Sequence, residues 1–199
     1  SATIDTTTLI QGFKITNGGS TSSGGGIYLS NAGIRLYHSE VSDNYVDTGS
    51  DQYGGGIYIN NSNLSLISNC AIKDNSISEA FATRNGGGIY FNNSTIKIYS
   101  SIISENLSRS GGGIEGFNSN LEAVDIIISD NLVFQAGSNG GAFFYNSTTN
   151  WDNCIIKNNG TTQLNISSGN CGGLGLSGGT HHFQNSIIRD NWHGWTNGG

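Results

Sequence analysis

Residues 86–106 read GGGIYFNNSTIKIYSSIISEN, and this stretch decides the fold. Apolar and polar residues alternate through it, which is the period of a β-strand and not of a helix. A glycine-rich start and an acidic–Asn end enclose the alternation, and the same pattern recurs along the 199 residues. The glycine-rich starts lie near residues 24, 54, 86, 111, 139 and 171. Repeats of 25 to 32 residues indicate coils that stack and share one elongated core.

Each repeat is predicted to contain three short strands. The first follows the glycines and points residues such as Ile57 and Ile59 inward. The second follows a turn rich in Asn and Ser, and its expected inward pairs are Ile34/Leu36, Leu64/Leu66, Ile96/Ile98 and Leu121/Ala123. The third buries residues such as Val41 and Ile72 just before the Asn. Because each strand pairs with its equivalent in the next coil, we expect an all-β, right-handed parallel β-helix, the hand following the usual crossover of parallel strands.

The whole chain, residues 1–199, is expected to form one β-helix domain with about six full coils and partial coils at both ends. The sequence has no methionine, and residues 9–17 resemble the second half of a coil. Residues 197–199 resemble the glycine-rich start of another coil. We therefore expect the chain to be a fragment of a longer solenoid.

The Asn that ends each repeat is predicted to form a ladder along one corner of the helix. Asn tolerates the left-handed backbone of a sharp corner, and stacked amides can hydrogen-bond from coil to coil. The residues of this asparagine ladder are Asn44, Asn75, Asn106, Asn131, Asn159 and Asn191.

Composition excludes several classes of function. The net charge of −6 gives no electrostatic site for nucleic acid, and no apolar run approaches the roughly 18 residues of a membrane span. Cys70 and Cys154 share an inward column roughly 14 Å apart at strand spacing, which is too far for a disulfide bond. The sequence implies no cofactor.

The repeats resemble those of a known group of surface proteins. GGGIY followed by I-x-x-N is similar to the GGA[IL] and FxxN repeats of chlamydial polymorphic outer-membrane proteins. It also resembles the Gly-rich, Asn-ended coils of bacterial surface proteins in the pectate-lyase-like superfamily. This resemblance implies a secreted, adhesive region located outside the cell or on its surface. It transfers no catalytic residue to this chain.

Two groups of residues could carry chemistry. An acidic column precedes the asparagine ladder and consists of Asp43, Asp74, Glu105 and Asp130. It is either a weak Ca²⁺ site or a solvated corner, and one carboxylate per coil is sparse for an ion that takes six or more oxygens. His181, His182 and His193 are the other group, but strand alternation turns His181 inward and His182 outward. No catalytic constellation is recognisable.

Two outward columns are candidate binding surfaces. The tyrosine strip, Tyr28, Tyr58 and Tyr90, could stack on sugar rings or pack beneath the variable loops. The isoleucine stripe consists of Ile102, Ile127, Ile155 and Ile187, which alternation places on the outside of the third strand. Four apolar residues in a row on a surface normally mark a contact.

The pattern as a whole favours a non-enzymatic module for adhesion, display or extracellular assembly. Its expected partner is a protein or carbohydrate surface, or another copy of the chain. One alternative is a carbohydrate-active lyase or hydrolase, although the sequence contains no Asp–Asp doublet. The other alternative is an ice-binding solenoid, although threonine is scattered and forms no regular column. Both alternatives rest on the fold alone.

Overall fold

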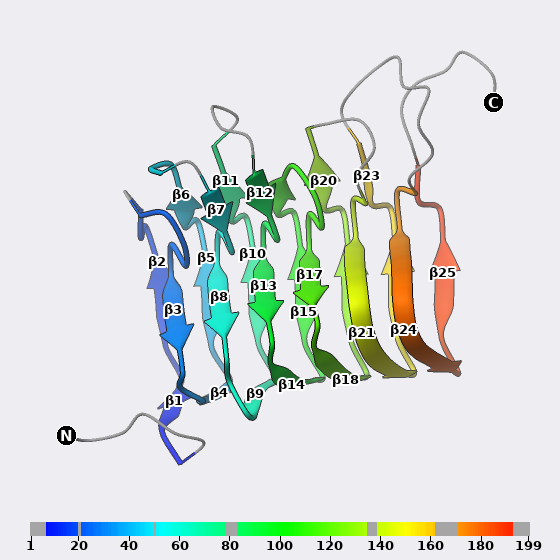
Figure 1. The fold of residues 1–199 in the computed structure, drawn as a ribbon, viewed down its shortest axis with the longest axis horizontal. Helices are drawn as coiled ribbons and strands as arrows, with labels where there is room; N and C mark the ends of the chain where they lie inside the picture. Colours follow the sequence, from blue (N-terminus) through cyan, green and yellow to red (C-terminus); the bar gives the residue numbers. More distant parts are fainter. Residues whose placement is uncertain are drawn as a thin grey trace.

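The computed structural model describes residues 7–19, 21–49, 51–78, 83–134, 139–161 and 171–192. These residues contain β-strands and no helix. Strands of successive coils lie side by side along the long axis of the molecule (Figure 1). They pair in parallel, as the three-strand repeat predicts. The predicted parallel β-helix is therefore confirmed.

The first strands begin directly after the glycines. They are β3 (Ile27–Ser30), β8 (Ile57–Asn60), β13 (Ile89–Asn92), β17 (Ile114–Phe117) and the first halves of β21 (Ala142–Asp152) and β24 (Leu174–Gln184). Ile57 pairs with Ile27 on one side and with Ile89 on the other, and all three are buried. The inward column expected from the alternation is present.

The second strands continue around the next corner. They are β1 (Leu9–Gln11), β4 (Arg35–Tyr37), β9 (Ser65–Ser68), β14 (Thr95–Tyr99), β18 (Asn120–Val124) and the second halves of β21 and β24. Because β21 and β24 run through the corner without a break, the first and second strands form one eleven-stranded sheet.

One expectation for this sheet is wrong. Leu64 and Leu66 do not point inward. Both are only partly buried, whereas Ser65 and Ile67 are buried. Ile67 pairs with Ile98, an inward residue of the next coil. The side chains of this one strand therefore alternate in the opposite sense to the prediction.

The reason is one extra residue in the turn before β9. The backbone N–H of Ser62 donates to Oγ of Ser94 at 3.1 Å, which fixes the two turns as equivalent. The residue that pairs with Ile96 is Ser65. Ser65 lies three positions after Ser62, whereas Ile96 lies two positions after Ser94. A shift of one residue moves every side chain of a strand to the other face.

The third strands form a separate seven-stranded sheet. They are β2 (Lys14–Thr16), β5 (Glu40–Ser42), β10 (Ala71–Lys73), β15 (Ile102–Ser104), β19 (Ile127–Ser129), β22 (Ile155–Lys157) and β25 (Ile187–Arg189). Their middle residues face the core, and Val41, Ile72 and Ile103 are fully buried. This sheet lies behind the first strands in Figure 1.

A fourth, two-residue strand follows the asparagine ladder and was not predicted. These strands are β6 (Tyr45–Val46), β11 (Ser76–Ile77), β16 (Leu107–Ser108), β20 (Leu132–Val133) and β23 (Gly160–Thr161). Their sequence signal is a buried apolar or small residue two positions after each ladder Asn from Asn44 to Asn159. Two insertion loops also pair, through β7 (Asp51–Tyr53) and β12 (Thr83–Asn85).

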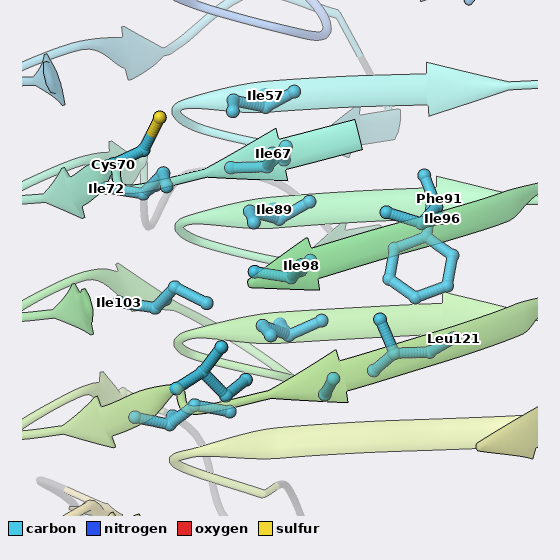
Figure 2. Close-up of a cluster of buried hydrophobic side chains, with 14 of the residues drawn as sticks. Ile57, Ile67, Cys70, Ile72, Ile89, Phe91, Ile96, Ile98, Ile103 and Leu121 are labelled. Atoms are coloured by element: carbon cyan, nitrogen blue, oxygen red, sulfur yellow. The ribbon is translucent and has the colours of Figure 1, made fainter. Parts of the chain in front are cut away.

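The core is a continuous column of Ile, Leu and Phe side chains between the sheets (Figure 2). One inward position is a glycine, Gly116, and its neighbours explain it. Phe91 and Phe144 precede and follow it in the column, with ring centroids 6.0 Å apart. A Cβ at Gly116 would lie 2.8 Å from both rings. The missing side chain therefore leaves the space that the two phenylalanines fill.

Candidate contact surface

The asparagine ladder lies along the corner between the third and fourth strands. The side-chain Nδ2 of Asn75 donates to Oδ1 of Asn106 at 3.0 Å and to the carbonyl of Val41 at 2.9 Å. The backbone N–H of Asn75 also donates to the Oδ1 of Asn106 at 3.0 Å. The same bonds recur from Asn44 to Asn191, and every member except Asn191 is buried. The ladder is an internal structural feature and not a binding site.

The backbone at this corner corrects a second expectation. The left-handed residue is not the ladder Asn but the residue before it. Asp43, Asp74, Glu105 and Asp130 of the acidic column have φ between 55° and 59°. Their side chains are exposed on the outside of the corner. In the part of the chain that the structure describes, no three His, Cys, Asp or Glu side chains lie close enough together to hold a metal ion. The structure therefore adds no support for a Ca²⁺ site.

The tyrosine strip is a stack of rings. Tyr28 and Tyr58 lie 4.9 Å apart between ring centroids at 15°, and Tyr58 and Tyr90 lie 5.8 Å apart at 6°. Tyr28 is 59% exposed, but Tyr90 is only 7% exposed because Tyr53 from β7 packs on it at 4.6 Å. Rings that stack on one another present their edges to solvent and not their faces. The geometry favours packing beneath the loops over stacking on sugars.

Glu115 continues the same column and was not singled out from the sequence. It pairs with Tyr90 on one side and with Phe143 on the other. The side chain is buried, and within the described residues its Oε2 has no hydrogen-bond partner. Burial raises the pKa of Glu115 to about 8, although the Ser110 side chain and the Gly86 backbone donate hydrogen bonds to it. No alternation rule identifies a buried acid in an outward column.

The isoleucine stripe lies on the outer face of the seven-stranded sheet, as the alternation predicts. Ile102, Ile127, Ile155 and Ile187 are direct register partners on β15, β19, β22 and β25. Ile102 is 47% and Ile187 49% exposed, and the two between them are partly exposed. These four residues form one apolar row across four paired strands of the outer sheet face.

The other end of the same column is charged. Its first residues are Lys14 and Glu40, whose Nζ and Oε1 atoms lie 3.2 Å apart. Lys73 lies in the neighbouring column, with its Nζ 3.6 Å from the same Glu40 oxygen. One half of the sheet face is therefore occupied by ion pairs and the other half by exposed isoleucines.

The column beside the isoleucines carries positive charge at its end. It runs from Ser104 through Ser129 to Lys157 and Arg189. The exposed acids Glu105 and Asp130 directly follow the two serines, at the corner of the sheet. Arg189 contacts its neighbour Asp190. Lys157 and Arg189 therefore flank one end of the isoleucine stripe, with Asp190 beside Arg189, and Glu105 and Asp130 flank the other end.

The histidines do not form a catalytic pair. His181 lies in an inward column, and its Nδ1 lies 2.9 Å from Oγ1 of the buried Thr149. His182 is exposed on the outer face, as the alternation predicts. His193 lies outside the described residues. Cys70, Cys154 and Cys171 are free thiols, of which only Cys171 is exposed.

His182 borders a polar groove of about 490 Å³ across β18, β21 and β24. Its polar lining residues are Glu122, Asn150, Asp152, His182 and Gln184. Lys97 donates to Oε2 of Glu122 at 2.8 Å, and the hydroxyl of Tyr99 donates to Oε1 at 2.5 Å. These two donors lower the pKa of Glu122. The carboxyl is therefore ionised near neutral pH and is a poor proton donor.

Comparison with known proteins identifies the fold family only. A family model described as the right handed beta helix region matches residues 4–195. No curated protein and no solved structure matched the chain. Within the described residues, no helix is long and apolar enough to cross a membrane.

Proposed function

The chain belongs to the right-handed β-helix family, and from that premise we propose a non-enzymatic secreted or cell-surface module for adhesion, display or extracellular assembly. The resemblance of its repeats to those of chlamydial polymorphic outer-membrane proteins supports the extracellular location. Its partner is a protein or carbohydrate surface, or a second copy of the chain.

The isoleucine stripe is the observation that carries this proposal. Ile102 is about half exposed, although it is a large apolar residue and its strand is paired on both sides. Burying apolar surface contributes roughly 25 cal/mol per Å². An apolar row that follows the register of four strands therefore favours contact with another surface.

The bonding in the interior favours a role for the β-helix as a rigid scaffold that carries the isoleucine stripe. Buried Asn side chains connect each coil to the next through the ladder. Buried and fully bonded polar networks stiffen a structure because every opening leaves polar groups without partners. A rod of this kind holds its outward columns in fixed register over its length.

The direct test replaces Ile127 and Ile155 with Lys and measures self-association by sedimentation and binding on protein and glycan arrays. We expect the loss of the contacts that the unmodified chain makes. Asn120→Lys adds a charge at an exposed position of β18 that lies outside the polar groove, and it serves as the matched control. Contacts that are equally strong in the double variant, or absent from the unmodified chain, contradict the proposal.

A carbohydrate-active enzyme is the second candidate, and the polar groove favours it. The ionised Glu122 can accept hydrogen bonds from sugar hydroxyls, and an N–H of His182 in the same groove can donate one to them. The depressed pKa of Glu122 makes it unsuitable as a general acid, so in this candidate enzyme its carboxylate would act as a base. Release of reducing or unsaturated ends from a polysaccharide panel, lost on Glu122→Gln, would favour the enzyme.

A further inference from the structure

The isoleucine stripe is complementary to itself. Its four residues lie at successive coils, so the row spans three coil spacings, about 14 Å. If two copies place these faces together with their rods antiparallel, the rows align from end to end. Ile102 then faces Ile187 of the second copy, and Ile127 faces Ile155 of the second copy. The two-fold axis of this arrangement runs parallel to the strands, between β19 and β22.

The charges beside the stripe favour the same arrangement. Lys157 of one copy lies opposite Ser129 of the second, next to the exposed Asp130. Arg189 lies opposite Ser104 of the second copy, next to Glu105. The two-fold axis repeats both contacts, which gives four pairings of opposite charge. Glu105 also approaches Asp190 of the second copy, and Arg189 lies between these two acids.

A parallel arrangement of the rods lacks these pairings. With the two-fold axis along the rods, each strand faces its own equivalent, and the columns on either side of the stripe exchange places. Lys157 then meets Asn153 of the second copy, and Arg189 meets Asn185. Those asparagines lie beside Asp152, so this arrangement also brings opposite charges together. It also places Lys14 opposite Lys14 and Glu40 opposite Glu40 of the second copy, because both residues lie in the column of the stripe. The antiparallel arrangement leaves this charged half of the column outside the contact. Repulsion between like charges in the parallel arrangement therefore favours the antiparallel orientation.

We propose that two copies of this chain pack antiparallel through β15, β19, β22 and β25, with the isoleucine stripes in contact. This proposal rests on the assembly role proposed above and names the partner as a second copy. A closed two-fold contact is the commonest form of homo-oligomer. Four short strands cover less than the roughly 800 Å² per partner of a standard interface. We therefore expect a reversible dimer whose population rises with concentration.

Cysteine crosslinking distinguishes the two orientations. Ile102→Cys and Ile187→Cys are made separately in a Cys171→Ser background, because Cys171 is the one exposed native thiol among the described residues. Packed sheets lie about 10 Å apart, too far for a direct disulfide, so a short bis-maleimide reagent is used. In the antiparallel dimer two copies of residue 102 are offset by about 14 Å, whereas residues 102 and 187 are opposite.

The expected result is crosslinked dimer from the mixture of the two variants and at least tenfold less from either variant alone. Crosslinking of each variant with itself indicates parallel rods and overturns the proposal, while the assembly role stands. A dimer that never crosslinks through these positions uses another surface and also overturns it. A monomer at all concentrations overturns it as well, and array binding then decides whether the stripe contacts a different partner. Circular dichroism verifies the fold of each variant.

Charge reversal provides an independent measurement. The double change Lys157→Glu and Arg189→Glu should weaken self-association at least tenfold at low salt. Adding Glu105→Lys and Asp130→Lys to the same chain restores pairs of opposite charge, and association should recover. If the fourfold variant remains as weak as the double variant, the antiparallel arrangement is contradicted.

Discussion

Asn106 donates its side-chain amide to Oδ1 of Asn131 at 2.9 Å, and both residues are fully buried. The backbone N–H of Asn106 donates to the same oxygen at 3.1 Å. One amide oxygen therefore accepts two hydrogen bonds from the preceding coil. The remaining amide hydrogen of Asn106 bonds to the carbonyl of Ile72 at 3.0 Å. Each ladder residue from Asn44 to Asn159 connects its own coil to the coils before and after it.

Replacing Asn106 with Leu should destabilise the fold. The change removes the ladder bonds on both sides and leaves the buried N–H of Asn75 without its acceptor. We expect the free energy of unfolding to fall by about 1–3 kcal/mol. Asn150→Leu, at an exposed position, is the matched control. An unchanged denaturant midpoint for Asn106→Leu would show that the ladder contributes nothing to stability.

Glu115 should make stability depend on pH. Its folded pKa of about 8 lies above its usual value of 4.5, so the folded state keeps a proton that the unfolded chain has lost. The stability that Glu115 contributes is therefore fully present below pH 4.5, is lost as the pH rises to about 8, and does not change above that. The slope in this window reaches roughly 1.4 kcal/mol per pH unit.

Glu115→Gln tests this relationship because glutamine has a similar shape and does not titrate. In thermal melts from pH 5 to 8, the transition temperature of the unmodified chain should fall, relative to that of the variant, as the pH rises. The two profiles should converge toward the acidic end, where Glu115 is protonated in both states. Parallel profiles across the whole range would mean that the carboxyl reaches solvent or a partner.

Tyr90 and Tyr28 should differ in how much they contribute to the free energy of unfolding. Tyr90 is buried against Tyr53, so Tyr90→Ala should lower the free energy of unfolding by roughly 2–4 kcal/mol. Tyr28 is mostly exposed, and Tyr28→Ala should change it by about 0.5 kcal/mol or less. Denaturant titration of the two variants measures both values. Glycan-array binding that disappears with Tyr28→Ala would instead support the sugar-binding interpretation of the strip.

The strand pattern could be predicted because apolar alternation repeats in almost every coil. Ile127 and Ile155 occupy the outward positions that the alternation gives them. The prediction failed at Leu64 and Leu66 because one inserted turn residue reverses the alternation and leaves the hydrophobic pattern looking regular. From the sequence alone, the pair Leu64 and Leu66 does not show whether these leucines or the residues that alternate with them pair with the inward residues of the next coil.

The burial of some outward-facing strand residues could not be predicted, for a different reason. Tyr90 and Glu115 occupy outward positions by alternation, and both are buried. The residues that cover them come from loops of varying length, such as the one that places Tyr53 on Tyr90. Loop packing depends on contacts between distant segments and leaves no period in the sequence. The charge complementarity beside the isoleucine stripe likewise appears only when the coils are placed in register.

Gly116 provides the last prediction, because it breaks the apolar pattern of its column. The repeats alone suggest that Gly116→Leu would complete the column and stabilise the protein. The structure predicts the opposite, since a Cβ there already lies 2.8 Å from the fully buried rings of Phe91 and Phe144. We expect Gly116→Ala to lower the free energy of unfolding by about 1–3 kcal/mol, and Gly116→Leu to lower it further.

A double-mutant cycle with Phe91→Leu tests the cause. Phe91→Leu should be destabilising alone, yet it should recover part of the stability that Gly116→Ala loses when the two changes are combined. Denaturant titration should give a coupling energy of at least about 0.5 kcal/mol. Additive effects, or a more stable Gly116→Ala variant, would show that the two rings do not depend on the space the glycine leaves.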